Sequence, residues 1–398
     1  MASLLLPPLP LALYVHFPWC VRKCPYCDFN SHAPRDDGNG IPFAAWAEAV
    51  TADLETTLPQ VEGRSIHSVF IGGGTPSLLP PPVLEKLLDT LRTRLPFETG
   101  IEITLEANPG AVEVLHFRDY RAAGVTRLSL GVQSFDDGLL ARIGRIHDSR
   151  EARRALEAAL AHFDRVNVDL MYGLPGQTPG QALTDLEIAV NDGIRHLSCY
   201  HLTIEPNTPF AHSPPDDLPI DDAVADMEEM TESFLADAGF SHYEISAFAR
   251  AGCECRHNLN YWHFGDYLGL GPGAHGKLTT PNGIVREMRH KHPARYLEGA
   301  VWRDFVQERH AVGAKELPFE FMMNALRLSE GVPATLFTER TGLPLEVIAG
   351  QLEKARCAAL LSPAPDRLRP TARGLRFLND LLQIFLPDRA PTALQVQD

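Results

Sequence analysis

The chain has 398 residues, of which 44% are hydrophobic and 22% are charged, and its formal net charge is −15. This composition is typical of a globular protein with room for two domains, and the negative charge argues against nucleic-acid binding through a basic face. The seven cysteines are an odd number. They do not favour a disulfide framework, and they fit a reducing cytoplasm.

The apolar N-terminus, MASLLLPPLPLALYV, predicts a short lead-in to a buried strand. It has no basic segment and is interrupted by Pro7, Pro8 and Pro10, which does not suit a secretory leader. A leader that ends at Cys20 is the competing interpretation. Because no stretch reaches the ~18 apolar residues of a membrane span, we predict a cytoplasmic protein.

Six short apolar segments alternate with amphipathic helical stretches through the first half of the chain. We predict strands at residues 13–17, 68–71, 102–105, 127–132, 166–170 and 196–204, and helices at 44–57, 82–94 and 149–162. Such alternation predicts an α/β fold with a parallel sheet, and six units indicate an incomplete (β/α)6 TIM-type barrel. Function in such a barrel lies at the carboxyl ends of the strands.

The second half of the chain has a different pattern. A proline- and acid-rich loop is predicted at 209–222, a helix at 223–238, and a linker at 290–310. A further helical region and a β-wing at 360–370 indicate a small, mostly helical domain of winged-helix type. We therefore divide the chain into a barrel at 1–215, a connecting region at 216–305 and a C-terminal domain at 306–398.

Cys20, Cys24 and Cys27 form a C-x3-C-x2-C motif directly after the first predicted strand. Three thiolates on one loop suit an iron–sulfur cluster better than structural zinc, which prefers four protein ligands. With three ligands, a four-iron cube keeps one iron open for a small chelating cofactor.

Further polar and glycine residues follow the next strands. The turn at Gly72–Pro76 (GGGTP) lets a ligand approach the backbone, and it lacks the G-K-S/T of a nucleotide P-loop. Four polar side chains follow the later strands: Glu106, Gln133, Arg145 and Asp169. A carboxylate among them can bind ribose hydroxyls, and the arginine can pair with a ligand carboxylate. For each of these side chains alone, a salt bridge or a strand-end cap is an equal alternative.

The cysteine triad and GGGTP together resemble the radical S-adenosylmethionine (SAM) enzymes. The runs YVHFP, ITLEANPG, LSLGVQSF, RIGRIH and VNVDLMYG extend the resemblance to the HemN family of oxygen-independent coproporphyrinogen III oxidases. The resemblance implies that Cys20, Cys24 and Cys27 ligate a [4Fe-4S] cluster. It also implies SAM contacts from Tyr14, Tyr26, Gly73, Gly74, Thr75, Glu106, Gln133, Arg145 and Asp169.

Three features resemble the HemW subgroup instead of the oxidases: a short N-terminus, the motif HNLNYW (His257 to Trp262), and Phe29 where the oxidases carry a further cysteine. This resemblance implies a heme chaperone that delivers heme to respiratory or other hemoproteins. A membrane-bound recipient would bring it to the inner membrane as a peripheral protein. The alternatives are a coproporphyrinogen oxidase of porphyrin biosynthesis, which cleaves SAM reductively, and a radical SAM methyltransferase. Dimerisation is left open.

His257 is the predicted heme ligand, because imidazole is a common axial ligand and Tyr261, Trp262 and Phe264 can wall a flat macrocycle. A structural histidine is the alternative interpretation. Other candidates nearby are His263 and His275. Cys253 and Cys255 would give His257 only an incomplete set of zinc ligands.

Overall fold

The computed structural model describes residues 9–34, 40–61 and 63–387. The first eight residues lie outside this range, so only the end of the segment interpreted as a lead-in or a leader is described. There, strand β1 begins at Leu11 and is almost entirely buried.

Six parallel strands, arranged in chain order, form the body of the molecule. They are β1 (Leu11–Phe17), β2 (Ile66–Gly73), β3 (Phe97–Ala107), β4 (Arg127–Gln133), β5 (Arg165–Tyr172) and β6 (His196–His201). All six predicted strands are present, although β6 ends three residues earlier than predicted. Their mostly buried residues are expected for a parallel sheet covered on both faces.

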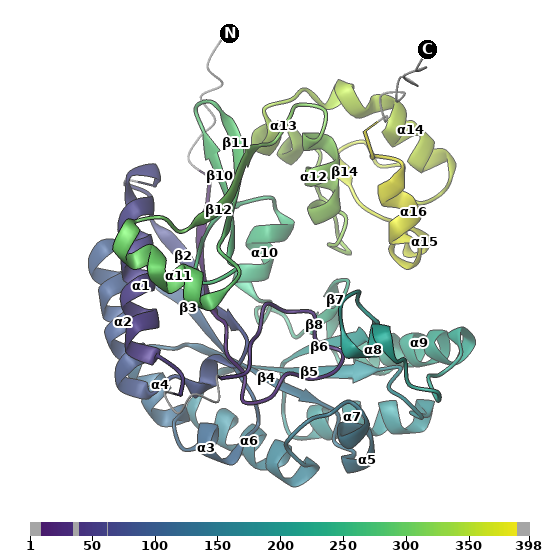
Figure 1. The fold of residues 1–398 in the computed structure, drawn as a ribbon. Helices are drawn as coiled ribbons and strands as arrows, with labels where there is room; N and C mark the ends of the chain where they lie inside the picture. Colours follow the sequence, from purple (N-terminus) through teal and green to yellow (C-terminus); the bar gives the residue numbers. More distant parts are fainter. Residues whose placement is uncertain (1–8, 35–39, 62, 388–398) are drawn as a thin grey trace, which may run out of the picture.

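Helices cover the outside of this sheet, as Figure 1 shows. They are α1 (Phe43–Thr57), α2 (Pro81–Arg94), α3 (Ala111–Val114), α4 (Phe117–Ala123), α5 (Asp137–Arg142), α6 (Ser149–His162) and α7 (Pro179–Asn191), with short 3-10 turns at Leu58–Gln60 and Pro76–Leu78. The start of α6 is fixed by a capping box between Asp148 and Glu151, and the start of α7 by one between Thr178 and Gln181. The incomplete barrel is therefore confirmed.

The sheet continues beyond the six predicted strands on both sides and has twelve strands among the described residues. Beyond β6 lie β8 (Ala247–Ala249) and β7 (Ser241–Glu244). Beyond β1 lie β9 (Asp266–Leu270), which is parallel to it, and then the antiparallel β10 (His275–Thr280), β11 (Gly283–Arg289) and β12 (Val306–Ala311). The extension brings residues from the second half of the chain next to β1.

The predicted linker at 290–310 is wrong. It contains helix α11 (Pro293–Trp302) and strand β12, which pairs with β11. The predicted loop at 209–222 contains the short helix α8 (Pro209–His212), and α9 (Asp221–Asp237) follows it. The boundary predicted at residue 305 thus falls just before a strand of the main sheet.

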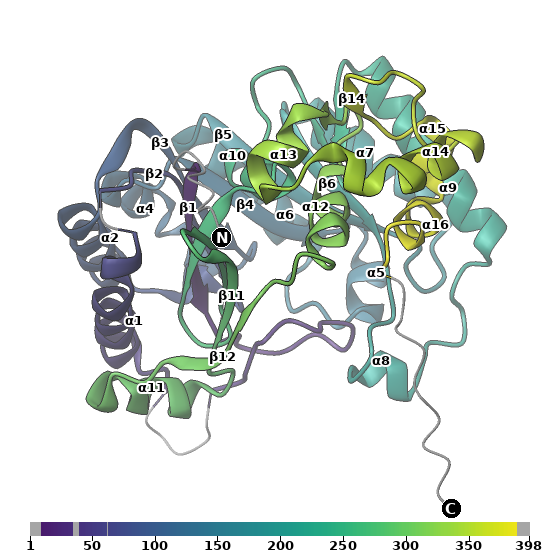
Figure 2. The ribbon, with the colours of Figure 1, turned by 90° about the horizontal axis from the view of Figure 1, so that it is seen from above.

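The C-terminal region is mostly helical, as predicted, and has its own hydrophobic core around Phe321, Phe337 and Leu381. Its elements are α12 (Leu317–Ala325), β13 (Val332–Pro333), α13 (Thr335–Thr341), a 3-10 turn at Leu345–Ile348, α14 (Ala349–Cys357), β14 (Arg367–Leu368), α15 (Ala372–Arg376) and α16 (Leu378–Gln383). The wing at 360–370 is closed by a bridge between Leu361 and Pro370. In Figure 2 these helices lie on the side of the barrel opposite α1 and α2.

Among the described residues, no helix combines the length and the apolar character that a membrane crossing requires.

Candidate functional site

Two adjoining cavities open at the carboxyl ends of the barrel strands. The small pocket has a volume of about 340 Å³ and lies between the cysteine loop and the ends of β2 to β6. The large cavity has a volume of about 690 Å³ and extends from β1 towards α10 (Arg256–Trp262) and the C-terminal helices. Six residues line both: Lys23, Asp28, Phe29, Ser31, Gly73 and Glu106.

The cysteine loop is closed at its base by backbone hydrogen bonds. Cys20 N–H donates to His32 O (3.0 Å), and His32 N–H donates to Pro18 O (2.7 Å). Cys20, Cys24 and Cys27 are half-buried free thiols that all line the small pocket. Within the described ranges, no three His, Cys, Asp or Glu side chains converge closely enough for a single metal ion. The three thiols line one wall of the small pocket, an arrangement that fits a cluster larger than a single ion.

Arg145 projects into the small pocket with one donor free. Its guanidinium donates to Asn108 Oδ1 (2.9 Å), Gly131 O (2.6 Å) and Cys24 Sγ (3.6 Å). The buried Nε has no hydrogen-bond partner among the described residues. Because an unpaired buried N–H is costly, this position suits an anionic ligand group such as the carboxylate of an amino acid.

Two carboxyl groups lie across the same pocket. Glu106 Oε2 accepts a hydrogen bond from Gly73 N–H (2.9 Å), and Asp169 accepts one from Asn167 Nδ2 (2.8 Å). Burial raises the pKa of Glu106 to about 7, and the nearby Asp169 carboxyl contributes to the increase. Burial also raises the pKa of Asp169. Both groups are suited to accept hydrogen bonds from ligand hydroxyls.

The glycine turn after β2 is required by packing as well as by any ligand. A Cβ on Gly73 (φ 116°) would lie 2.5 Å from the His16 ring, and a Cβ on Gly74 would lie 2.4 Å from Trp19 O. Thr75 beside them is buried and accepts a hydrogen bond from Asn108 Nδ2 (3.1 Å). The turn can therefore approach β1 only without side chains.

The small pocket collects eight of the nine residues predicted to contact SAM. They are Tyr26, Gly73, Gly74, Thr75, Glu106, Gln133, Arg145 and Asp169. Gln133 has an unusual positive φ of 73° and accepts a hydrogen bond from Tyr200 Oη (2.8 Å). Tyr14 lies on the large-cavity side instead, where its hydroxyl is 2.9 Å from His16 Nδ1.

His257 is buried beneath the large cavity and does not line it. Its Nδ1 lies 3.1 Å from Ser68 Oγ, and its Nε2 lies 2.9 Å from Tyr261 Oη, so both ring nitrogens are paired. Burial lowers the pKa of His257 to about 3 and keeps the ring neutral. Tyr261 and Trp262 do line the cavity, as predicted.

The other candidates near His257 occupy different positions. The prediction that Phe264 forms part of the cavity wall is wrong. Phe264 packs against Phe321 in the C-terminal core. His263 binds Leu259 O (2.8 Å), whereas His275 is exposed and lines the large cavity. Cys255 is buried and points towards Glu102 Oε1 (3.7 Å), so the described residues do not support a zinc site with His257.

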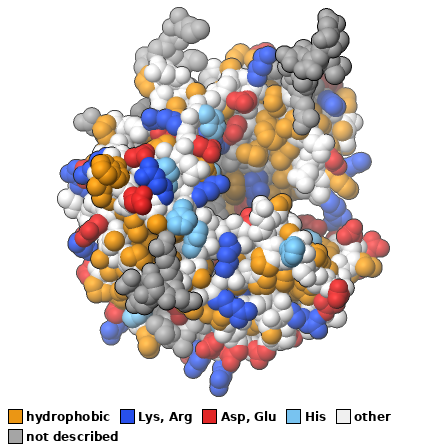
Figure 3. All heavy atoms as spheres, viewed as in Figure 1, with side chains coloured by type: hydrophobic (Ala, Val, Ile, Leu, Met, Phe, Trp, Pro, Cys, Tyr) orange, Lys and Arg blue, Asp and Glu red, His pale blue; other side chains and the backbone are white. Residues whose placement is uncertain are grey.

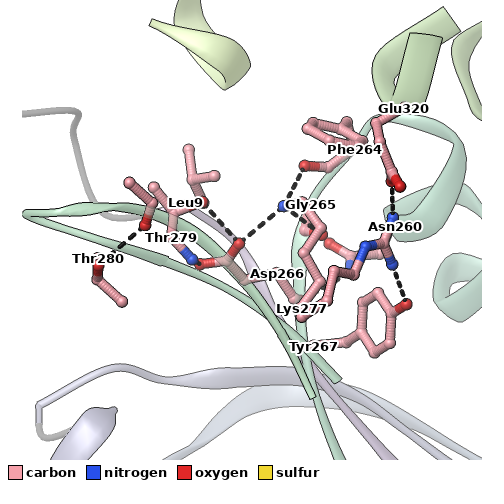
Figure 4. A network of polar contacts seen from close by, with 12 residues as sticks. Leu9, Asn260, Phe264, Gly265, Asp266, Tyr267, Lys277, Thr279, Thr280 and Glu320 are labelled. Atoms are coloured by element: carbon pink, nitrogen blue, oxygen red, sulfur yellow. Dashed lines mark hydrogen bonds and ion pairs between the residues drawn. The ribbon is translucent and has the colours of Figure 1, made fainter. Parts of the chain in front are cut away.

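A buried polar network fixes the far wall of the large cavity (Figure 4). Lys277 Nζ donates to Phe264 O (3.0 Å), Gly265 O (3.3 Å) and Asp266 Oδ1 (2.9 Å). On the other side of the network, Arg286 donates to Tyr267 Oη (2.7 Å) and pairs with Glu320 of α12. Tyr267, a cavity-lining residue, is thereby connected to the C-terminal helices.

The HNLNYW motif also has a structural role that sequence reasoning missed. Asn260 binds Asp266 O through Nδ2 (2.9 Å), and its Oδ1 lies 3.1 Å from His67 Nε2. Together with His257 and Ser68, these contacts hold α10 against β2. Other missed residues of the large cavity are Lys23, Asn30, Tyr267 and Lys291. The glycine- and aromatic-rich run around Tyr267 was the available signal.

Known protein families and known proteins match this chain over most of its length. Residues 14–188 match the radical SAM superfamily, and residues 312–377 match the HemN C-terminal domain. The chain is 47% identical to the heme chaperone HemW of Escherichia coli K12, over 95% of this chain and 99% of the relative. It is 46% identical to HemW of Haemophilus influenzae, over 95% and 98%.

A more distant relative and a solved structure agree. The mitochondrial radical S-adenosyl methionine domain-containing protein 1 of the mouse is 36% identical over 94% of this chain and 87% of its own length. The structure of coproporphyrinogen III oxidase (HemN) from E. coli superposes with a TM-score of 0.80 at 23% identity, covering 95% of this chain and 90% of that one. At that identity, the match shows a shared fold.

Proposed function

Because the chain belongs to the HemW family within the radical SAM superfamily, we propose that it is a heme chaperone. It binds a [4Fe-4S] cluster, SAM and heme, and it delivers heme to respiratory or other heme-accepting apoproteins. The observation that carries the proposal is the large cavity beside the predicted cluster and SAM pocket. Its volume of about 690 Å³ is within the roughly 300–1,000 Å³ range of small-molecule sites.

The walls of the large cavity suit a flat, mostly apolar macrocycle. Tyr261, Trp262 and Tyr267 present aromatic surface, and the Tyr261 and Tyr267 rings meet edge to face at 4.5 Å. Aromatic walls bury much apolar area and retain polar groups for orientation. Two of these three residues belong to the HNLNYW motif, which connects the motif to heme binding.

The small pocket supplies the residues for the other two cofactors. Cys20, Cys24 and Cys27 would ligate the cluster, which when bound provides electron transfer. Arg145, with its unpaired Nε, would pair with the SAM carboxylate, and Glu106 would accept hydrogen bonds from ribose hydroxyls.

We further propose that His257 ligates the heme iron once Tyr261 moves aside. The Tyr261 hydroxyl covers Nε2 in the structure, so ligation requires this hydrogen bond to break. The low pKa of His257 supports the role, because neutral imidazole is the form that binds metals. Tyr261 therefore acts as a cover over the ligand.

Heme titration of the anaerobically reconstituted protein tests both statements. His257→Ala should lose tight heme binding, whereas Tyr261→Phe should retain it or bind heme more tightly, because the variant lacks the hydroxyl that pairs with Nε2. The matched control is His263→Ala, which changes the histidine directly after the motif, whose ring is hydrogen-bonded to Leu259 O and has no contact with Tyr261 among its hydrogen bonds in the described residues. If Tyr261→Phe loses heme as completely as His257→Ala, His257 positions Tyr261 and is not the ligand.

The same preparation separates the chaperone from the oxidase. The residues predicted to contact SAM gather in one pocket, and this is the observation that favours coproporphyrinogen oxidase activity. We expect heme binding without protoporphyrinogen formation from coproporphyrinogen III, SAM and dithionite. Turnover of the porphyrinogen at catalytic rates would overturn the chaperone proposal.

A further inference from the structure

Two lysines that are far apart in the sequence, Lys23 and Lys291, both line the large cavity. Lys23 lies in the cysteine loop, and Lys291 lies in the turn between β11 and α11. Lys23 Nζ donates to Phe29 O (2.8 Å), and Lys291 O accepts a hydrogen bond from Asn30 Nδ2 (2.9 Å). The two lysines therefore flank the adjacent residues Phe29 and Asn30.

Asn30 fixes this arrangement. Its Nδ2 also donates to Pro272 O (2.9 Å), and its own carbonyl is 3.0 Å from His16 Nε2. Gly273, with φ 78°, provides the space, because a Cβ there would lie 2.4 Å from Asn30 Nδ2. The Asn30 side chain thus fixes the Lys291 backbone next to the cysteine loop that carries Lys23.

Lys23 and Lys291 line the large cavity and are both exposed, although the chain as a whole carries a net charge of −15. Burial lowers the pKa of His275, and Lys291 is the next cause.

Two acidic residues also line the cavity. Asp28 is exposed, and Glu106 accepts a hydrogen bond from Gly73 N–H. Figure 3 shows blue and pale blue side chains on one side of the central hollow and hydrophobic ones on the other.

We propose that Lys23 and Lys291 form a carboxylate subsite that holds the two propionate groups of heme. This inference rests on the proposed function. Heme carries both carboxylates on one edge of an apolar ring, so an edge with two lysines opposite an aromatic wall matches its polarity. The ring lies against Tyr261, Trp262 and Tyr267, and the propionates point to the lysine side. Charge-assisted hydrogen bonds between ammonium and carboxylate groups supply the attraction.

Comparing heme with its dimethyl ester tests the subsite, because the ester keeps the ring and the iron but has no negative charge at that edge. The full-length reconstituted protein should bind heme at least about tenfold more tightly than the ester, which corresponds to about 1.4 kcal/mol. The double variant Lys23→Met with Lys291→Met should lose this preference and keep the affinity for the ester. Lys23→Arg with Lys291→Arg should retain it, and Lys86→Met on the outer face of α2 is the control.

Each result has a separate meaning. Equal binding of heme and ester by the unmodified protein overturns the subsite and leaves the chaperone proposal intact. A heme preference that survives the double methionine variant also overturns the subsite. Binding of neither compound overturns the proposed function itself. Loss of the preference with unchanged ester affinity supports the subsite and shows that the variant is folded.

Discussion

At the end of β3, the Glu106 side chain is half-buried, and its carboxyl group accepts a hydrogen bond from Gly73 N–H (2.9 Å). Burial raises its pKa to about 7, whereas the ordinary value is 4.5. In the unfolded chain this group ionises near the ordinary value, so between about pH 4.5 and 7 the folded state binds more protons than the unfolded state. The contribution of Glu106 to stability therefore falls as pH rises through this window.

Glu106→Gln should remove this penalty. We expect the free energy of unfolding of the cofactor-free variant to match the unmodified protein near pH 4 and to exceed it above pH 7, by on the order of 2 kcal/mol. Chemical denaturation across this pH range measures the difference. Glu98→Gln, an exposed change on the same strand, is the control. A difference that stays constant with pH would contradict the assignment, and reduced SAM affinity of Glu106→Gln would link the penalty to binding.

Among the elements, those with dense apolar runs were predictable from the sequence, and the sheet extensions were not. β1 to β6 are buried and β-rich, which gives each a clear signal. β12 reads VQERHA, and five of its six residues are exposed, so it has no apolar pattern. β9 is short, and its partner β1 lies about 250 residues earlier in the chain. Pairing at such a distance depends on tertiary packing, which local patterns do not contain.

The same distinction applies to the site. The small pocket was predictable because its residues follow consecutive strands and carry family motifs. The large cavity depends on contacts such as those of Asn30 with Pro272 and Lys291, which join distant turns. The hydrogen bond between His257 and Ser68 could not be predicted either, since Ser68 lies on β2, 189 residues earlier in the chain.

A buried ion pair joins the first helix to this added part of the sheet. Arg289 of β11 donates to Asp53 of α1 (2.9 Å) and to Glu287 (2.7 Å), and both Asp53 and Arg289 are almost fully buried. Tyr296 Oη also donates to Asp53 (2.8 Å). Removing one partner would leave the Arg289 charge poorly compensated in the protein interior.

Asp53→Ala should therefore lower the free energy of unfolding by about 3–5 kcal/mol. The matched control on the same helix is Glu55→Ala, which breaks a solvent-facing pair with Arg94 and should cost about 1 kcal/mol or less. Adding Arg289→Met to Asp53→Ala should recover part of the loss, because the uncompensated charge is removed. Denaturant midpoints of the four proteins measure these effects, and equal costs for the two single variants would contradict the buried-pair argument.

On the scale of the whole molecule, the two cavities depend on different parts of the chain. All residues that line the small pocket lie between Cys20 and Glu205. The large cavity also uses residues 261–291 and Asn324 of α12. The C-terminal helices contact its walls through Arg286 with Glu320 and through Arg327, whose guanidinium lies 4.4 Å from the Trp262 ring centre. Docking of the C-terminal region should thus shape the large cavity and leave the small pocket unchanged.

Arg286→Met tests this separation. It removes the donor that holds Tyr267 Oη (2.7 Å) and the ion pair to Glu320, so Tyr267 and α12 are no longer connected. A lost charge-assisted hydrogen bond is worth about 1.5–3 kcal/mol, and we expect heme affinity to fall about tenfold or more while SAM affinity is unchanged.

Calorimetric titration with each ligand, together with a thermal unfolding curve to confirm folding, measures both affinities on one preparation. Arg295→Met removes a solvent-exposed arginine of α11, paired with Asp304, and should alter neither affinity. If Arg286→Met weakens SAM and heme equally, the two cavities form one coupled unit. Selective loss of heme binding would mean that the C-terminal region tunes heme affinity independently of the cofactors in the barrel.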